Sequence, residues 1–306
     1  MKLDRFLTNK VDRLIGRHAR FAGILGDRPS RYSKSPALWN AAFKAARLNA
    51  VYLPFDVPDG KLAPFLKALR KDPRFLGMNV TVPHKVSVAR RVRLAGEARR
   101  IRAVNTVVRT PKGDFIGHST DGPGAVRALT KTLPGHRRPF LRSLTGCKVV
   151  LLGAGGSARA VAFALSDALG SKGFLGIFNR TPARASALAR MIGRRGRSAP
   201  SLRNLEIALK NADLIVNCTP LGQSGPLGGR SPLTARQIAL LKPGARIFDL
   251  VYAPPVTSLI RRGRKAGHQV KNGRDMIVWQ AVLAFKLVAG RRLPENRIAE
   301  VMSHAW

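Results

Sequence analysis

The residues with the clearest chemical use are the glycines of a turn that joins an apolar strand to an alanine-rich helix. The stretch from Lys148 to Leu165 reads KVVLLGAGGSARAVAFAL. A glycine permits the tight turn, a second glycine lets backbone N–H groups approach a pyrophosphate, and the start of the next helix attracts negative charge. An alternative is a helix start whose small residues serve packing alone. The residues predicted to bind a dinucleotide here are Gly153, Ala154, Gly155, Gly156 and Ser157.

The next apolar strand, FLGIF, indicates which dinucleotide the site takes. It is followed by Asn179, Arg180 and Thr181, with Arg184 one helical turn later. An acidic residue at this point accepts the free ribose 2′-hydroxyl of NAD, and it would repel a 2′-phosphate. A guanidinium instead offers that phosphate a planar, charge-assisted pair of donors. The strand end therefore favours NADP.

Eight short motifs stand in one order around this turn. Before it come Tyr-Ser-Lys-Ser-Pro (32–36), Asn-Val-Thr-Val-Pro-His-Lys (79–85), Ala-Val-Asn-Thr (103–106) and Ser-Thr-Asp-Gly (119–122). After it come Asn-Arg-Thr (179–181), Asn-Cys-Thr-Pro-Leu-Gly (217–222), Asp-Leu-Val-Tyr (249–252) and Asn-Gly-Arg-Asp-Met-Ile-Val-Trp-Gln (272–280). In these motifs and their order, the chain resembles the shikimate dehydrogenases over about residues 21–290.

The resemblance implies an enzyme that uses NADP for the reversible reduction of 3-dehydroshikimate to shikimate, in aromatic amino-acid and chorismate biosynthesis. Shikimate is a ring carboxylate with three hydroxyls, so its site needs an anion holder and several neutral hydrogen-bonding groups. Taken alone, two serines spaced two apart before a proline are typical of a helix cap. The resemblance instead places them at the carboxylate. It implies as substrate residues Ser33, Ser35, Asn79, Thr81, Asn105, Tyr252 and Gln280, and adds Thr219 and Gly273 to the cofactor site.

Transfer of a hydride to or from a ring carbon also requires a group that handles the hydroxyl proton. The resemblance assigns this role to Lys85, with Asp121 as its partner, and leaves His84 as a neighbour. A nearby carboxylate stabilises a charged lysine, whereas burial acts against it, and the sequence leaves open which effect is larger. No cluster of Cys or His has metal-ligand spacing, so we expect no metal.

Several residues depart from the family pattern close to the expected pocket. Tyr32 stands where the family usually has histidine, Arg102 where it has glycine and Ser119 where it has asparagine; the loop after residue 26 is longer by about one residue. These changes leave quinate or an aminoshikimate open as substrates. Ser35 favours shikimate, because the relatives that use quinate tend to have threonine there and a methyl group changes the space beside the carboxylate.

The elements that must position these residues follow an α/β alternation. We expect strands at 21–25, 50–55, 78–82 and 103–108, and helices at 35–48, 62–69 and 87–93, ahead of the glycine turn. The fold class is therefore α/β with two domains: an N-terminal mixed or parallel α/β substrate domain and a Rossmann-type NADP-binding domain. We place the substrate domain at 1–121, completed by C-terminal helices at 273–306, and the NADP-binding domain at 122–272.

The charge composition bears on whether the protein binds nucleic acid. The 306 residues include 55 Lys and Arg against 16 Asp and Glu, a formal net charge of +39. The basic residues are scattered without a long run, so we interpret them as solvated faces. A nucleic-acid-associated protein on a retired dehydrogenase scaffold is the alternative, and we expect no specific nucleic acid as a partner.

The N-terminus and the cysteines bear on location. No apolar run approaches the length of a membrane span, and the two cysteines are read as reduced core thiols. We therefore predict a cytoplasmic protein without a membrane partner, a monomer or homodimer with a small-molecule substrate. Apolar residues at helical spacing in 1–20 predict an N-terminal helix packed on the body, with organelle import or membrane contact as the alternative.

Overall fold

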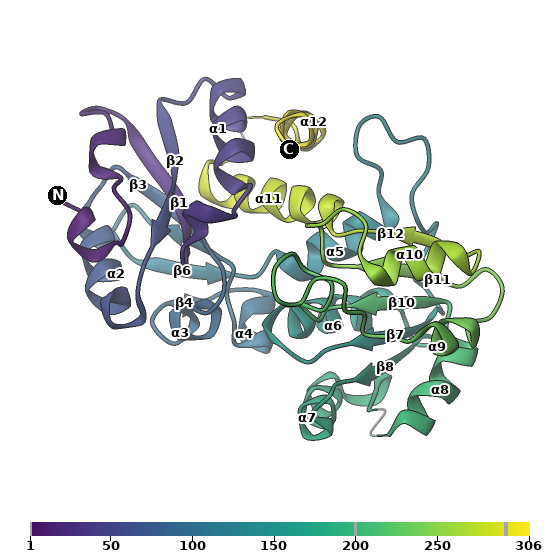
Figure 1. Cartoon of the computed structure of the whole chain (residues 1–306). Helices are drawn as coiled ribbons and strands as arrows, with labels where there is room; N and C mark the ends of the chain where they lie inside the picture. The colour runs from purple at the N-terminus through teal and green to yellow at the C-terminus, as the bar shows by residue number, and fades with distance from the viewer. Residues whose placement is uncertain (1, 199–200, 291–292) are drawn as a thin grey trace. The chain divides into compact units, whose positions relative to one another are not determined.

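The computed structural model describes residues 2–198, 201–290 and 293–306 and divides into two compact units (Figure 1). The first unit comprises Met1–Thr120, Leu133–Gly135 and Val278–Trp306. The second comprises Asp121–Thr132 and His136–Ile277. Each unit contains its own six-stranded sheet, which confirms the two-domain α/β fold class.

The sheet of the first unit is mixed, in the order β2-β1-β3-β5-β6-β4. Strands β2, β1 and β3 run parallel, β5 is antiparallel to both of its neighbours, and β4 pairs parallel with β6. Two of these strands, β4 and β6, were not predicted from the sequence, and β4 includes Arg93, the last residue of the helix expected at 87–93, because α3 ends at Ala89. The strands are β1 (Arg20–Gly26), β2 (Ala50–Asp56), β3 (Phe75–Val80), β4 (Arg93–Leu94), β5 (Thr106–Arg109) and β6 (Phe115–His118).

Two apolar clusters hold this sheet. In one, Phe21 and Phe55 of the strands are buried with Phe65 of α2. In the other, Trp39 of α1 contacts both Tyr52 of β2 and Phe285 of α11. Alternate residues of a strand face opposite sides, so the two clusters use both faces of the sheet. The helices are α1 (Ser35–Ala45), α2 (Leu62–Lys71), α3 (Lys85–Ala89), α4 (Glu97–Ile101), α11 (Arg274–Val288) and α12 (Glu295–His304), with 3-10 turns at Pro29–Arg31 and Asp59–Lys61.

The N-terminal segment differs from the predicted helix. It forms two separate 3-10 turns, Asp4–Phe6 and Asp12–Leu14. The two aspartates hold each other's turns: the N–H of Leu3 donates to Asp12 Oδ1 at 2.7 Å, and the N–H of Val11 donates to Asp4 Oδ1 at 2.7 Å. Leu3 and Val11 are buried in the core of the first unit. The expected packing on the body is present, but the helix prediction was wrong because aspartate side chains replace helical carbonyls as acceptors.

The sheet of the second unit is parallel throughout, in the order β12-β11-β10-β7-β8-β9. This is the strand order 3-2-1-4-5-6 of a dinucleotide-binding Rossmann sheet, with β7 as the first strand. The strands are β7 (Lys148–Leu152), β8 (Phe174–Phe178), β9 (Gly196–Ser198), β10 (Leu214–Asn217), β11 (Arg246–Asp249) and β12 (Gln269–Lys271).

Helices cover this sheet. Leu205 and Leu209 of α8, Ile238 of α9 and Leu259 of α10 share one buried cluster with residues of β7, β10 and β11. The helices α6 and α7 contact β8. The bounds are α5 (Asp121–Thr130), α6 (Gly156–Ala168), α7 (Pro182–Ile192), α8 (Leu202–Asn211), α9 (Ala235–Ala239) and α10 (Ser258–Lys265), with a 3-10 turn at Gly193–Arg195.

The units divide after Thr120 and after Ile277, whereas the sequence analysis places the boundaries after residues 121 and 272. Helix α5 belongs to the second unit because it packs on α6: a Cβ on Gly122 would lie 2.4 Å from the Ala160 carbonyl oxygen. Helix α11 begins in the second unit and continues in the first. Among the described helices, none has both the length and the apolar character needed to cross a bilayer.

Candidate functional site

A buried tyrosine anchors the polar side chains of the first unit. The Tyr52 hydroxyl, on β2, donates to Asn79 Oδ1 at 2.7 Å and also hydrogen-bonds with the side chain of Ser35 at the start of α1. Burial raises the pKa of Tyr52 well above its usual value, and the hydrogen bonds to Asn79 and Ser35 oppose that shift. The phenol is therefore neutral and links two of the predicted substrate residues.

Asn79 extends this chain of hydrogen bonds toward Asn105. Its Nδ2 donates to the Asn105 carbonyl oxygen at 3.2 Å and to Thr106 Oγ1 at 3.1 Å. Asn105 Nδ2 in turn donates to Gln280 Oε1 at 3.3 Å. Residues from α1, β2, β3, the segment before β5 and α11 thus meet in one polar network, which we call the Asn79–Asn105 network.

The other predicted substrate residues of the first unit lie nearby in the chain. Ser33 Oγ accepts the N–H of Ser35 at 3.2 Å in the turn before α1. The N-cap residue of α1 is Lys34, without a side-chain cap hydrogen bond, so the contact orients the two serines but is not a helix cap. Thr81 directly follows β3 and packs so closely on Gly26 that a Cβ there would lie 2.3 Å from its methyl group.

Lys85 is the first residue of α3 and is half-buried. Its carbonyl oxygen accepts the N–H of Val104 at 3.1 Å, which joins the start of α3 to the segment that carries Asn105. The preceding His84 is buried, with Nε2 2.8 Å from the Val57 carbonyl oxygen and Nδ1 3.2 Å from Asp59 Oδ1. Both histidine nitrogens are thus turned toward other oxygens, which agrees with its expected role as a neighbour.

The glycine turn of the second unit has the geometry that its sequence predicts. Gly153 has φ of +112°, and a Cβ there would lie 3.2 Å from the carbonyl group of Cys218, so both backbone conformation and space require glycine. Around Gly155 and Gly156, by contrast, a Cβ would meet no atom within 4 Å. Helix α6 starts at Gly156 without a side-chain cap. Its first N–H groups are therefore placed to bind an anion.

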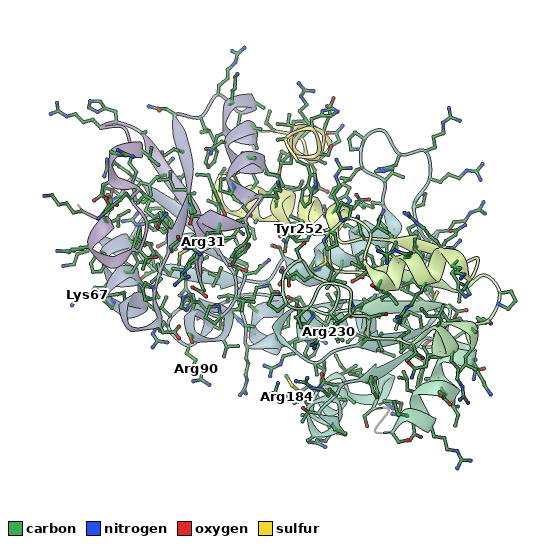
Figure 2. All side chains as sticks on the ribbon, in the orientation of Figure 1. Arg31, Lys67, Arg90, Arg184, Arg230 and Tyr252 are labelled. Atoms are coloured by element: carbon green, nitrogen blue, oxygen red, sulfur yellow. The ribbon has the colours of Figure 1, made fainter. Side chains whose placement is uncertain are left out.

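Basic side chains follow the neighbouring strand β8. Arg180, Thr181 and Arg184 are exposed, and Arg184 extends outward from α7 in Figure 2. Asn179 Nδ2 donates to the Thr181 carbonyl oxygen at 3.0 Å and fixes this turn. Because β7 and β8 are adjacent and parallel, their carboxyl ends place the glycine turn and the arginines at one edge of the sheet.

A second set of contacts fixes the loops that follow β10 and β11. Asn217 Oδ1 accepts the Thr219 N–H at 2.9 Å, and Asn217 Nδ2 donates to Asp249 Oδ1 at 2.9 Å. Asp249 also accepts the Thr257 hydroxyl at 2.6 Å. Burial raises the pKa of the Asp249 carboxyl, and the hydrogen bonds that the carboxyl accepts lower the pKa by a smaller amount. Tyr252 follows on the same segment, and burial raises the pKa of its phenol as well.

Comparisons with known proteins agree with this geometry. A family described as "Shikimate dehydrogenase substrate binding domain" matches residues 24–107, and one described as "Shikimate / quinate 5-dehydrogenase" matches residues 137–227. A protein of Moorella thermoacetica named shikimate dehydrogenase (NADP(+)) is 39% identical over 283 residues, 90% of each chain. The chain belongs to the shikimate dehydrogenase family.

Solved structures of the family have the same fold. The shikimate 5-dehydrogenase of Thermus thermophilus, in complex with NADP(H) and shikimate, is 35% identical, with a TM-score of 0.77 over 94% of this chain and 100% of that one. A quinate dehydrogenase from Corynebacterium glutamicum, in complex with NAD, is 30% identical, with a TM-score of 0.77 over 94% and 99%. Similarity of fold alone therefore does not separate the two substrates.

Within this family framework, sequence reasoning missed two polar residues of the first unit. Tyr52 was included only in an apolar strand, although a buried tyrosine generally needs a partner for its hydroxyl. Thr120 was overlooked beside Asp121, yet it is buried and bonded to Asn105. Asp121 begins α5 in the second unit and Lys85 lies in the first, and their pairing stays a prediction.

Proposed function

We propose that this protein is an NADP-dependent shikimate dehydrogenase that reversibly reduces 3-dehydroshikimate to shikimate. One observation carries the assignment: the Asn79–Asn105 network joins residues that are far apart in the sequence but that all belong to shikimate dehydrogenase motifs. They are Ser35, Asn79, Asn105 and Gln280. Tyr52 links Ser35 to Asn79, Asn79 bonds to Asn105, and Asn105 bonds to Gln280. Members of the family with this name share 39% identity with the chain.

The network offers chemistry that matches a small hydroxylated carboxylate. Serine hydroxyls at the start of α1 donate to the carboxylate, and amide side chains both donate to and accept from ring hydroxyls. Because the side-chain amides of Asn79 and Asn105 already bond to other groups of the network, their orientations are set before the substrate arrives. Preorganised polar groups cost less to order on binding, and they reject analogues that lack a hydroxyl.

Lys85 and Asp121 are proposed to handle the proton of the reacting hydroxyl. Lys85 accepts that proton when shikimate is oxidised and returns it in the other direction, with the Asp121 carboxylate stabilising the ammonium form. Contacts inside the first unit support this proposal. The Lys85 carbonyl bonds to Val104, the next residue Asn105 bonds to Thr120, and Asp121 follows Thr120 in the chain.

The cofactor fits the turn of the second unit on two structural grounds. Gly155 and Gly156 leave open space where a side chain would block a pyrophosphate, and Arg180 and Arg184 are exposed where a 2′-phosphate needs donors. NADP, when bound, accepts or supplies the hydride. Asn217 accepts the Thr219 N–H, and Asp249 accepts the N–H of Val251, the residue before Tyr252; we propose that these contacts set the loops around the nicotinamide.

Three further expectations, on location, nucleic-acid binding and oligomeric state, remain proposals. Both cysteines are free, the state that a reducing compartment maintains, which supports a cytoplasmic location. The basic residues are spread over both units, as the labelled Lys67, Arg90 and Arg184 illustrate in Figure 2. We therefore propose no specific nucleic-acid partner and a monomer or homodimer. Nucleic-acid binding that resists physiological salt would contradict the proposal that the protein has no specific nucleic-acid partner.

The test of the activity is a substrate panel. Purified, folded protein is mixed with NADP⁺ and shikimate, quinate or aminoshikimate, and NADPH formation is followed by its absorbance. We expect turnover with shikimate at a kcat/KM at least about 10-fold above the others, because Ser35 lacks the methyl group of the threonine that quinate users tend to have. No turnover with any of the three would overturn the proposed function, and a preference for quinate would overturn only the choice of substrate.

A further inference from the structure

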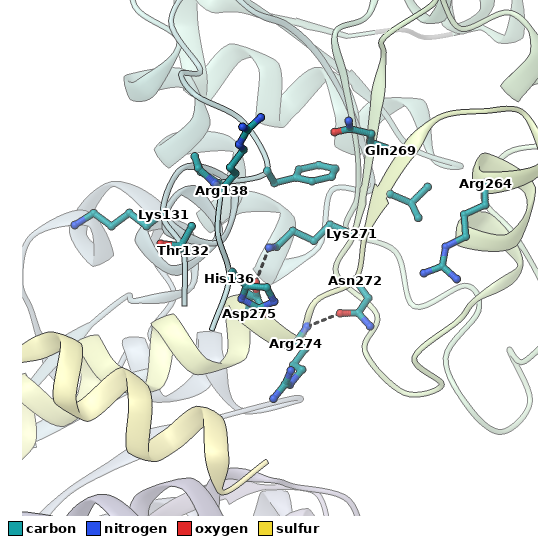
Figure 3. Close-up of a pocket in the computed structure, with 13 residues that line it drawn as sticks. Lys131, Thr132, His136, Arg138, Arg264, Gln269, Lys271, Asn272, Arg274 and Asp275 are labelled. Atoms are coloured by element: carbon teal, nitrogen blue, oxygen red, sulfur yellow. Dashed lines mark hydrogen bonds and ion pairs between the residues drawn. The ribbon is translucent and has the colours of Figure 1, made fainter. Parts of the chain in front are cut away.

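A cavity of about 490 Å³ lies in the second unit, against the edge strand β12 (Figure 3). Its walls come from the segment between α5 and β7, from α10, from β12 and from the start of α11. Five of the 13 residues that line it are Lys or Arg, against 55 of 306 in the whole chain. Basic side chains are therefore enriched here even in a strongly basic protein.

The charges are distributed around the cavity rather than on one side. In Figure 3, Lys131 and Arg138 of the segment before β7 lie opposite Arg264 of α10, with Lys271 and Arg274 between them. Lys131, Arg138 and Arg264 are exposed, so solvent and dissolved anions have access to these side chains. Several cations around one concave site attract an anion more strongly than the same charges spread over a convex surface.

Internal contacts hold the inner wall in place. Lys271 Nζ lies 2.5 Å from Asp275 Oδ2, and Asn272 Oδ1 accepts the N–H of Arg274 at 3.2 Å. Of the described residues that line the cavity, Asp275 alone is acidic. It neutralises Lys271, so the inner wall carries one ion pair, and the exposed Lys131, Arg138 and Arg264 supply the charge that a ligand meets.

The cavity is separate from the glycine turn within the same sheet. Strand β12 is three positions from β7 and four from β8. Neighbouring strands are about 4.8 Å apart, which places β12 about 14 Å from β7. An anion held at β12 therefore does not use the groups assigned to the pyrophosphate or to the 2′-phosphate of the cofactor.

We propose that this cavity binds a compact polyanion of the polyphosphate class. Its volume falls within the range of small-molecule sites and is too small for a nucleic-acid duplex. The exposed arginines Arg138 and Arg264 match phosphate oxygens, which accept two parallel hydrogen bonds from one guanidinium. A ligand with several phosphate groups is long enough to reach cations on both walls, which a single phosphate is not.

Calorimetry with tripolyphosphate as the probe tests this site. The protein is first saturated with NADP⁺ and shikimate, so the cofactor groups are occupied, and the titration is run at about 150 mM salt. We expect one site, with an affinity at least about 10-fold higher than for inorganic phosphate. Equal affinity for the two probes, or loss of binding at this salt, would overturn the proposal, since scattered surface charge behaves in that way.

Paired variants separate the cavity from general charge. The double variant Arg138→Ser, Arg264→Ser should weaken tripolyphosphate binding by at least about 10-fold. The control variant Arg190→Ser, Arg203→Ser removes the same charge from exposed positions on α7 and α8, and it should weaken binding by less than about 2-fold. Asp275→Asn should strengthen binding at least about 3-fold, because it frees Lys271, and a damaged fold would not produce such a gain. Equal effects of the two pairs, or weaker binding by Asp275→Asn, would contradict the assignment.

Discussion

Asn105 and Thr120 are joined by three hydrogen bonds, one of which runs from Thr120 Oγ1 to Asn105 Oδ1 at 3.3 Å. Asn105 Nδ2 donates to Thr120 Oγ1 at 2.9 Å, and the Thr120 backbone N–H donates to Asn105 Oδ1 at 2.8 Å. Both residues are buried. The pair fixes the last residue before Asp121 to the amide that also bonds to Gln280, so one side chain connects the proposed substrate groups with the proposed proton-transfer pair.

Asn105→Ala should therefore affect both stability and turnover. It leaves the buried Thr120 N–H without its acceptor, a loss of about 1–3 kcal/mol in the free energy of unfolding. We also expect kcat/KM for shikimate to fall by at least about 10-fold, because the position of Asp121 is no longer fixed. Denaturant unfolding and steady-state kinetics measure the two effects. Asn211→Ala, at an exposed position on α8, is the control, and equal effects of both variants would refute this role.

Arg180→Asp should change cofactor choice. The carboxylate repels a 2′-phosphate and accepts a ribose hydroxyl, so the ratio of kcat/KM for NADP⁺ to that for NAD⁺ should fall by at least about 100-fold. Arg203→Asp removes the same charge from an exposed position on α8 and should leave the ratio within about 2-fold. An unchanged ratio for Arg180→Asp would rule out this arginine as the 2′-phosphate ligand.

Arg102→Gly should stabilise the protein. Arg102 caps the C-terminal end of α4 with φ of +56° and ψ of +35°, where the family usually has glycine. A left-handed conformation costs a non-glycine residue about 1–2 kcal/mol, partly offset by the greater freedom of glycine in the unfolded chain, so we expect a net gain of about 0.5–1 kcal/mol. Arg100→Gly, inside α4, should instead lose about 1 kcal/mol. Thermal melts distinguish the two, and a lower Tm for Arg102→Gly would contradict the expectation.

The ion pair of Asp72 with Arg74 should make the stability of the protein depend on pH. Burial raises the pKa of this carboxyl, but the hydrogen bonds from Arg74 together lower the pKa by a larger amount. The pKa of folded Asp72 therefore lies below its usual value. The folded state therefore binds fewer protons than the unfolded state, and the stabilisation is present above about pH 4 and lost as the pH falls through the folded pKa. The stability difference between wild type and Asp72→Asn should shrink between about pH 6 and pH 3; a constant difference would exclude this ion pair as the cause.

The sequence predicts the second unit better than the first, for a physical reason. The glycines of the turn are required by local backbone geometry at Gly153 and by open space at Gly155, and such local demands are visible in a motif. The parallel strand order follows from the alternation of strands and helices. The short strands β4 and β6 were missed because they contain two and four residues and are stabilised by pairing with each other and with β5.

The polar network of the first unit was predicted only in part. Its asparagines belong to recognisable motifs, but Tyr52 joins Ser35 to Asn79 through contacts across 17 and 27 positions in the chain, which no local pattern encodes. In the N-terminal segment, by contrast, a local pattern predicted an element that does not form. Its apolar spacing suits a helix, yet the reciprocal bonds of Asp4 and Asp12 stabilise two turns instead.

The proposed reaction requires Lys85 and Asp121 to act as one proton-transfer unit. The direct test is kcat for shikimate oxidation in Lys85→Ala, Asp121→Asn and the double variant, each verified as folded. We expect each single variant to lose about 10²–10⁴ in kcat, and the double variant to lose no more than the worse single variant, because residues that act together are not additive. A double variant whose loss equals the product of the two single losses would contradict the shared role.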